Sequence, residues 1–149
     1  MTALSSLPEQ ERVHCVEYIL NQFITTRSQV NLPEPVENML KHLAERATLV
    51  AITNGNLNFS SLDWSCYFAA YYSPVMGYRA KPHPQMLEVA ASEHKHAISE
   101  LIHIGDSIAF DQQAALRAGS RFVHFAPFED KQNSLQSQCE ELLQKLVSL

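Results

Sequence analysis

Apolar residues recur along the 149-residue chain at two spacings, which predict helices and strands respectively. Five segments place them three or four positions apart, as in a helix with one buried face. These predicted helices cover about residues 7–27, 36–43, 84–91, 111–118 and the stretch from 134 onward. Four shorter apolar runs have the length and composition of buried strands. These predicted strands cover residues 49–53, 67–72, 101–104 and 122–125.

The order of these elements predicts the fold class. Strands alternate with helices, which favours an α/β fold with a largely parallel, Rossmann-like sheet of about four strands flanked by helices. The connections between parallel strands are expected to be right-handed crossovers. The length suits one domain with a substantial core and makes a second independent core unexpected.

Polar residues that could bind a ligand or a metal follow three of the apolar segments. Thr53-Asn54-Gly55 ends the first strand, Lys81 precedes a proline-marked helix start, and Gly105-Asp106-Ser107 ends the third strand with Asp111 close behind. In open α/β sheets, ligands bind beyond the carboxyl ends of the strands. A hydroxyl, a lysine and two carboxylates at one such edge predict a site for phosphate and a divalent metal.

The series Thr53, Lys81, Asp106 and Asp111 resembles three of the four motifs of the haloacid dehalogenase superfamily, in its phosphatases with a small helical cap. The resemblance is strongest over residues 47–125. It implies that Thr53, Asn54, Gly55 and Lys81 bind the phosphate of a small phosphorylated molecule. Within the same resemblance Lys81 offsets the phosphate charge, and Asp106 and Asp111 belong to a Mg²⁺ site.

The family's first motif, an Asp-x-Asp pair that supplies the nucleophile, has no counterpart in this sequence. The chain has four aspartates, at positions 63, 106, 111 and 130, and none precedes Thr53. Loss of a covalent nucleophile costs on the order of a millionfold in turnover. The resemblance therefore implies a truncated phosphatase scaffold with little or no catalysis alone and with weak residual binding of phosphate and Mg²⁺.

The same resemblance predicts the domain organisation. Residues 1–32 are expected to be a remnant of the helical cap with its linker, and residues 33–149 the core. In the family, the strand that bears the first Asp lies between the strands ending at Thr53 and Asp106. Because buried backbone groups need partners, those two strands must pair directly or another segment or chain must fill the gap.

Structural alternatives exist for each candidate residue. Asn-Gly is a common turn pair, Lys81 could be a solvated lysine, and Asp106 and Asp111 could cap a turn and a helix.

For the function of the whole chain, one alternative is a non-catalytic module that forms homodimers through helix 7–27 or an exposed sheet. Another is a phosphatase completed by a partner chain that supplies the Asp strand. A Gly-Asp-Ser block also occurs in serine esterases, but the expected Asp-x-x-His pair is missing.

Composition narrows the cellular setting and the partners. The net charge of −5 argues against nucleic-acid binding through a broad basic surface. Three widely spaced cysteines predict reduced thiols rather than a disulfide framework or a zinc site. The first ten residues lack the pattern of a signal peptide, and no apolar run reaches membrane-spanning length. These features predict a cytoplasmic protein with no membrane partner.

Overall fold

The computed structural model describes residues 8–27, 31–129 and 131–149, so residues 1–7 and 28–30 of the predicted cap remnant and linker lie outside the described residues. The chain divides into two compact units. One comprises Met1–Asn31 and Leu57–Ser65, and the other comprises Leu32–Asn56 and Cys66–Leu149. The first unit contains the helix α1, the 3₁₀ turn Phe59–Ser61 and the start of a second 3₁₀ turn, Asp63–Tyr67. The rings of Phe59 and Trp64 meet edge to face. Every predicted site residue belongs to the second unit.

The α/β fold class predicted from the sequence is confirmed, with helices and short parallel strands alternating along the chain. The α-helices are α1 (Glu9–Arg27), α2 (Glu34–Ala44), α3 (Gln85–Glu93), α4 (Gln113–Ala118) and α5 (Leu135–Val147). The strands are β1 (Val50–Ile52), β2 (Ala70–Tyr72), β3 (Ile102–Gly105) and β4 (Arg121–His124). The predicted strand 67–72 is halved, because Tyr67 ends the 3₁₀ turn Asp63–Tyr67 and Phe68 and Ala69 are irregular.

The four strands form two separate parallel pairs rather than one sheet. β1 pairs with β2, with Ala51 opposite Tyr71, and β3 pairs with β4, with His103 opposite Phe122. Among the described residues, each sheet has two strands. The strands ending at Thr53 and Asp106 therefore do not pair with each other, which was one of the two outcomes open from the sequence.

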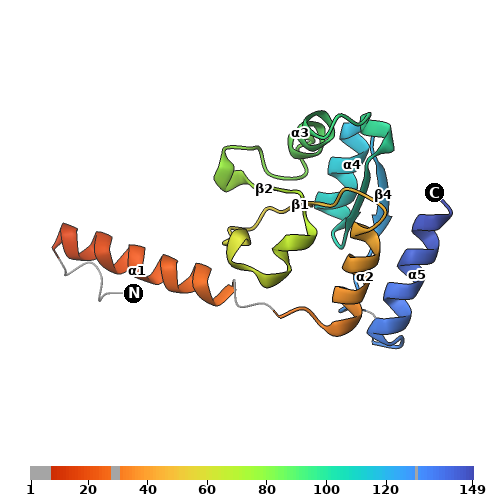
Figure 1. Ribbon diagram of the computed structural model, residues 1–149. Coiled ribbons are helices and arrows are strands. Elements are labelled where there is room, and N and C mark those ends of the chain that lie inside the picture. Colours follow the sequence, from red (N-terminus) through yellow and green to blue (C-terminus); the bar gives the residue numbers. More distant parts are fainter. Residues whose placement is uncertain (1–7, 28–30, 130) are drawn as a thin grey trace. The chain divides into compact units, whose positions relative to one another are not determined.

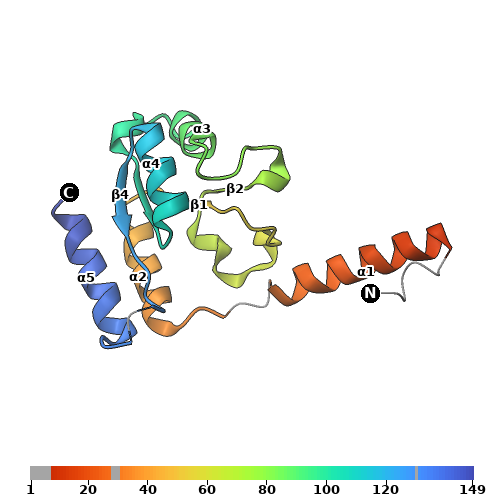
Figure 2. The same ribbon diagram turned by 180° about the vertical axis from the view of Figure 1, so that it is seen from behind.

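The helices cover the two strand pairs on different sides. α2 and α5 lie side by side (Figures 1 and 2) and pack with β3 and β4 around Met39, Cys139 and Leu142. α3 packs against β1 and β2 around Met86 and Ala90. A third cluster joins α3 to α4 and includes Ile52 of β1, Leu101 just before β3 and Phe122 of β4. The apolar spacing that predicted these helices thus corresponds to their buried faces.

Helix ends follow the local chemistry of the sequence. Ser134 caps α5, its hydroxyl oxygen accepting a hydrogen bond from the Ser137 N–H at 3.2 Å. α4 is preceded by a π-helical turn, Ile108–Gln112, so the predicted helix 111–118 begins as a wider turn that contains Asp111.

Throughout the described parts of the chain, helices fall short of the length and apolarity needed to cross a membrane.

Candidate functional site

The loop after β1 is tied to the segment that carries Lys81. The Asn54 side chain makes two hydrogen bonds to the Lys81 backbone, accepting from its N–H at 2.7 Å and donating to its C=O at 2.8 Å. The Gly55 N–H donates to Thr53 Oγ1 at 2.9 Å, which closes a tight turn. Asn54 therefore positions Lys81, and the Thr53 O–H is the group of this turn that keeps a proton to donate to a ligand.

The Lys81 side chain connects the ends of two strands from different sheets. Its ammonium donates to Ile52 O, at the end of β1, at 2.9 Å. It also forms an ion pair with Asp111 Oδ1 at 2.5 Å, beyond the end of β3. With its side chain only 10% exposed, Lys81 is a nearly buried cation and not the solvated surface lysine of the structural alternative. The structure thus brings Thr53, Lys81 and Asp111 together at the carboxyl ends of β1 and β3.

Asp111 is the most enclosed carboxylate at this position, with 4% of its surface exposed. Besides Lys81, it accepts from His103 Nε2 at 3.0 Å and from the Ser107 N–H at 3.0 Å. Burial by itself would raise the pKa of Asp111. The hydrogen bonds from His103, Lys81 and Ser107 outweigh burial and hold this pKa well below its usual value of 3.8. Asp111 is therefore a carboxylate anion at any physiological pH.

Gly105 makes room for this carboxylate. A Cβ atom added at Gly105 would come within 2.6 Å of three side-chain atoms of Asp111. The glycine that ends the apolar strand is thus required by the close approach of Asp111 and not by an unusual backbone angle. Ser107 then starts the turn, with its hydroxyl accepting from the Phe110 N–H at 3.2 Å.

The two aspartates differ in their surroundings. Asp106 is exposed, and its backbone carbonyl accepts from His124 Nε2 at 3.0 Å. Both Asp111 carboxylate oxygens are already hydrogen-bonded, and the described residues hold no group of three His, Cys, Asp or Glu side chains suited to a metal. Mg²⁺ requires an octahedral shell of oxygens. The arrangement of these residues does not fit a Mg²⁺ site without further ligands, and the assignment of Asp106 and Asp111 as ligands stays a prediction.

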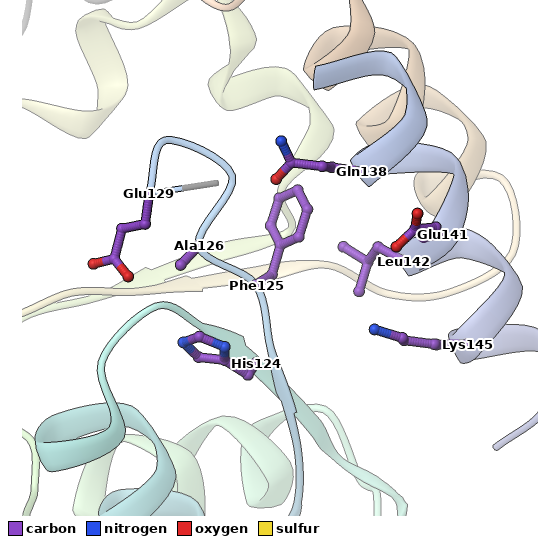
Figure 3. A pocket seen from close by; sticks show the side chains of 8 residues that line it. All are labelled: His124, Phe125, Ala126, Glu129, Gln138, Glu141, Leu142 and Lys145. Carbon is purple, nitrogen blue, oxygen red and sulfur yellow. The ribbon is translucent and has the colours of Figure 1, made fainter. Parts of the chain in front are cut away.

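A separate pocket of about 280 Å³ opens beside the end of β4. Figure 3 shows that its lining side chains come from the end of β4, the loop that follows and α5, among them His124, Glu129 and Lys145. None of the sequence-predicted site residues lines it. The hydrogen bond from His124 to the Asp106 carbonyl is its link to the predicted site.

His103 is the site residue that sequence reasoning missed. It occupies the middle of β3 and is 7% exposed, with its ring near that of Phe122. Since Asp111 is ionised and can only accept, the Nε2–H of His103 is the donor. The signal was available in the sequence, because a histidine inside an apolar strand needs a polar partner when buried.

Comparison with known proteins identifies the class of protein that this fold and site represent. The family model of haloacid dehalogenase-like hydrolases matches residues 2–119. The chain therefore belongs to the haloacid dehalogenase-like hydrolases, as the three sequence motifs predicted.

Individual relatives agree with this assignment. The chain is 32% identical over 105 residues to the 5-amino-6-(5-phospho-D-ribitylamino)uracil phosphatase YigB of Escherichia coli K12. This match covers 70% of the chain and 44% of the phosphatase. A 2-haloacid dehalogenase structure from Pseudomonas syringae superposes with a TM-score of 0.79 at 26% identity, covering 93% of this chain and 65% of the dehalogenase.

A predicted phosphoglycolate phosphatase from Haemophilus somnus, 20% identical with a TM-score of 0.64, supports the fold alone; the match covers 79% of this chain and 55% of that one. The chain thus spans less than half of the curated relative and less than two thirds of each of these structures.

Proposed function

We propose that the chain is a phosphatase scaffold of this family that retains weak recognition of phosphate and has little or no catalysis on its own. The observation that carries the proposal is Lys81, a nearly buried ammonium fixed beside the Thr53 hydroxyl at the carboxyl ends of two strands. Both groups suit a phosphate oxygen. The name of the curated relative, a 5-amino-6-(5-phospho-D-ribitylamino)uracil phosphatase, favours a small phosphorylated molecule as ligand.

Local charge explains why we expect the binding to be weak. The site has one lysine and two aspartates, Asp106 and Asp111, so it carries a net negative charge near neutral pH. An anion gains little there, and we expect dissociation constants of ~1 mM or weaker. We also propose that Mg²⁺ binds weakly, because Asp111 already accepts hydrogen bonds from Lys81 and His103. The absence of an aspartate before Thr53 supports the lack of catalysis alone.

Phosphate recognition is tested by titrating the ¹⁵N-labelled chain with inorganic phosphate, with and without MgCl₂, and following the backbone amide signals by NMR. We expect shifts concentrated at Gly55, Lys81 and Ser107. Lys81→Met should abolish them, whereas Lys41→Met, at an exposed lysine paired with Glu37, should leave them unchanged. Shifts that persist in Lys81→Met would refute the proposed phosphate site.

Hydrolysis of p-nitrophenyl phosphate with Mg²⁺ tests the second half of the proposal. We expect no turnover above buffer for the chain or for its Asp106→Asn variant. Turnover that disappears in Asp106→Asn would contradict the loss of catalysis and would require a nucleophile other than an aspartate before Thr53.

The division of the chain stays part of this proposal. We interpret residues 1–32 as the remnant of a helical cap and residues 33–149 as the core.

A second candidate function, self-association through α1, is favoured by one observation: five apolar side chains of this helix are each roughly half exposed. They are Val13, Val16, Tyr18, Ile19 and Leu20.

Solution mass tests the second candidate. Sedimentation equilibrium should give a dimer for the parent chain and a monomer for Ile19→Glu, because a charge in an apolar interface is costly. A substitution at the exposed Glu17, Glu17→Gln, is the matched control on the same helix. A parent chain that sediments as a monomer at high micromolar concentration would eliminate this candidate.

A further inference from the structure

A buried histidine lies behind the predicted phosphate site and is hydrogen-bonded to one of its carboxylates. Of the residues that the structure describes, three polar or charged side chains are buried: Ser73, His103 and Asp111. His103 Nε2 lies 3.0 Å from Asp111 Oδ1, and both side chains are less than a tenth exposed. Asp111 in turn forms the ion pair with Lys81. His103 is therefore placed to act on Lys81 through the carboxylate.

The two oxygens of Asp111 accept from three donors. Oδ1 accepts from the Lys81 ammonium at 2.5 Å and from His103 Nε2 at 3.0 Å. Oδ2 accepts from the Ser107 N–H at 3.0 Å. A carboxylate oxygen has two lone pairs, so Lys81 and His103 together fill Oδ1. Because these two donors share one acceptor atom, a change at either of them alters the hydrogen bond of the other.

Two of the three donors are held in place by the fold, whereas the third is on a flexible side chain. Ser107 donates through its main chain, and His103 lies in the middle of β3, paired with Phe122 of β4. The His103 and Phe122 ring centroids are 6.3 Å apart. The Lys81 ammonium, by contrast, ends a flexible four-carbon chain. The strand and the turn thus orient the Asp111 carboxylate, and the carboxylate orients the ammonium.

The Lys81 ammonium has one more proton than its protein acceptors use. An ammonium carries three N–H donors. Two of them donate to Ile52 O and to Asp111 Oδ1, and the described residues provide no third acceptor. Charge-assisted hydrogen bonds from ammonium to phosphate are among the stronger hydrogen bonds in proteins. The third N–H is therefore the donor that a phosphate oxygen can accept.

Loss of the His103 donor would leave Lys81 as the described partner of Asp111 Oδ1. Asp111 is buried and ionised, so a lost hydrogen bond leaves negative charge that the remaining donors must offset. Ser107 donates to the other oxygen from a fixed backbone position, and Lys81 is the donor that can move. An ammonium drawn closer to Asp111 presents less positive charge to a ligand, because opposite charges at short range offset each other.

We propose that His103 is a positioning residue of the phosphate site: it holds Asp111 so that the Lys81 ammonium keeps one N–H for a phosphate oxygen. The inference rests on the proposed function of Lys81 and adds the residue that sets the position of its ammonium. His103 does not contact the phosphate, since its side chain is 8% exposed and its Nε2–H donates to Asp111. A histidine that only fills the interior of β3 would leave Lys81 unaffected by its loss.

The first experiment observes the Lys81 ammonium by lysine-selective ¹H–¹⁵N NMR, near neutral pH and without phosphate. The Lys81 signal is assigned by its absence in Lys81→Met. His103→Leu removes the donor and keeps a side chain in the strand, and it should shift this signal by more than the line width. His103→Gln should restore the parent position, because its side-chain N–H₂ can donate to Asp111. No shift in His103→Leu, or an equal shift in both variants, would overturn the proposal.

Phosphate titration then measures the effect on binding, followed at the Gly55 amide. The affinity should fall roughly fivefold for His103→Leu and stay within about twofold of the parent for His103→Gln. Equal affinities of the parent and His103→Leu would contradict the proposal. A parent chain whose amide signals do not respond to phosphate would refute the proposed function of Lys81. The ammonium signal, measured without phosphate, would still decide whether His103 positions Lys81.

A matched variant separates positioning from a general loss of stability. Val123→Ala removes apolar contacts from β4 beside β3, at a position 9% exposed, and changes no hydrogen-bond donor. It should lower the urea midpoint and leave both the Lys81 signal and the phosphate affinity unchanged. A response of these two readouts as large as that in His103→Leu would assign the effect to destabilisation and would overturn the proposal.

A measurement on the unaltered chain keeps the test valid should His103→Leu fail to fold. Because Lys81 and His103 share Asp111 Oδ1, a phosphate that attracts the ammonium should strengthen the hydrogen bond from His103. The Nε2–H proton signal of His103 should then move downfield as phosphate is added, while the ring signals of the exposed His96 stay in place. A stationary His103 signal, at phosphate concentrations that shift the Gly55 amide, would overturn the proposal.

Discussion

The carboxyl ends of β1 and β3 are connected by side chains, whereas along their length the same strands both line a cavity of about 810 Å³, which we call the strand gap. At the ends, Lys81 joins Ile52 O to Asp111, and His103 adds a third contact. Along the strands, the facing edges present backbone groups to a cavity whose lining holds apolar residues and also polar ones such as His42 and Glu100. The difference teaches that a network of charged side chains can join two strand pairs at their ends where no backbone hydrogen bonds join them.

The largest effect is expected for a substitution that removes the Lys81–Asp111 ion pair at the carboxyl ends of β1 and β3. Asp111→Ala leaves the Lys81 ammonium nearly buried and unpaired, which should lower the free energy of unfolding by about 3–5 kcal/mol. Urea denaturation followed by circular dichroism measures this change. Glu37→Gln is the control: it removes an exposed ion pair with Lys41 and keeps an oxygen that can accept from the Tyr67 hydroxyl, so the midpoint should stay unchanged. A loss for Asp111→Ala no larger than for Glu37→Gln would mean that the network does not join the strand pairs.

A change of pH acts on the same network without altering side-chain volume. The pKa of Asp111 is lower in the folded chain than its usual 3.8, so the unfolded chain takes up a proton first as the pH falls. The stabilisation by ionised Asp111 is thus complete well above pH 3.8 and is lost as the pH falls below it, through the folded-state pKa. Urea midpoints of the parent chain and Asp111→Asn should therefore converge as the pH is lowered from 5 toward 3. A difference that stays constant over this range would contradict the assigned shift.

The smallest effect is expected inside the strand gap. Ile104→Val removes one methyl group that already borders open space, so unfolding should change by only about 0.5 kcal/mol, the low end for this substitution. Leu87→Ala, at a position of α3 that is 0% exposed and does not line the strand gap, should cost about 2–5 kcal/mol. Urea denaturation distinguishes the two. An Ile104→Val loss as large as that for Leu87→Ala would mean that the strand gap is packed and not open.

Much of the fold and part of the candidate site could be predicted from local patterns. Apolar spacing located the five α-helices of the described residues. The polar residues predicted at the ends of apolar segments included Thr53 after β1, Lys81 before α3 and Asp111 after β3, which lie together. Neither the role of Asn54 in positioning Lys81 nor the partnership of His103 with Asp111 could be predicted in this way. Each is a contact between residues distant in sequence or on different elements, and residue spacing does not encode such contacts.

The sequence by itself determined the alternation of helices and strands, the family motifs and the absence of an aspartate before Thr53, because these depend on residue identity and short-range order. Only the tertiary structure decided that β1 and β3 stay apart and that Lys81 spans their ends. Which strands pair depends on how helices pack across the whole unit, since α3 covers one strand pair and α2 with α5 the other. That balance of burial is a property of the assembled unit and not of any single segment.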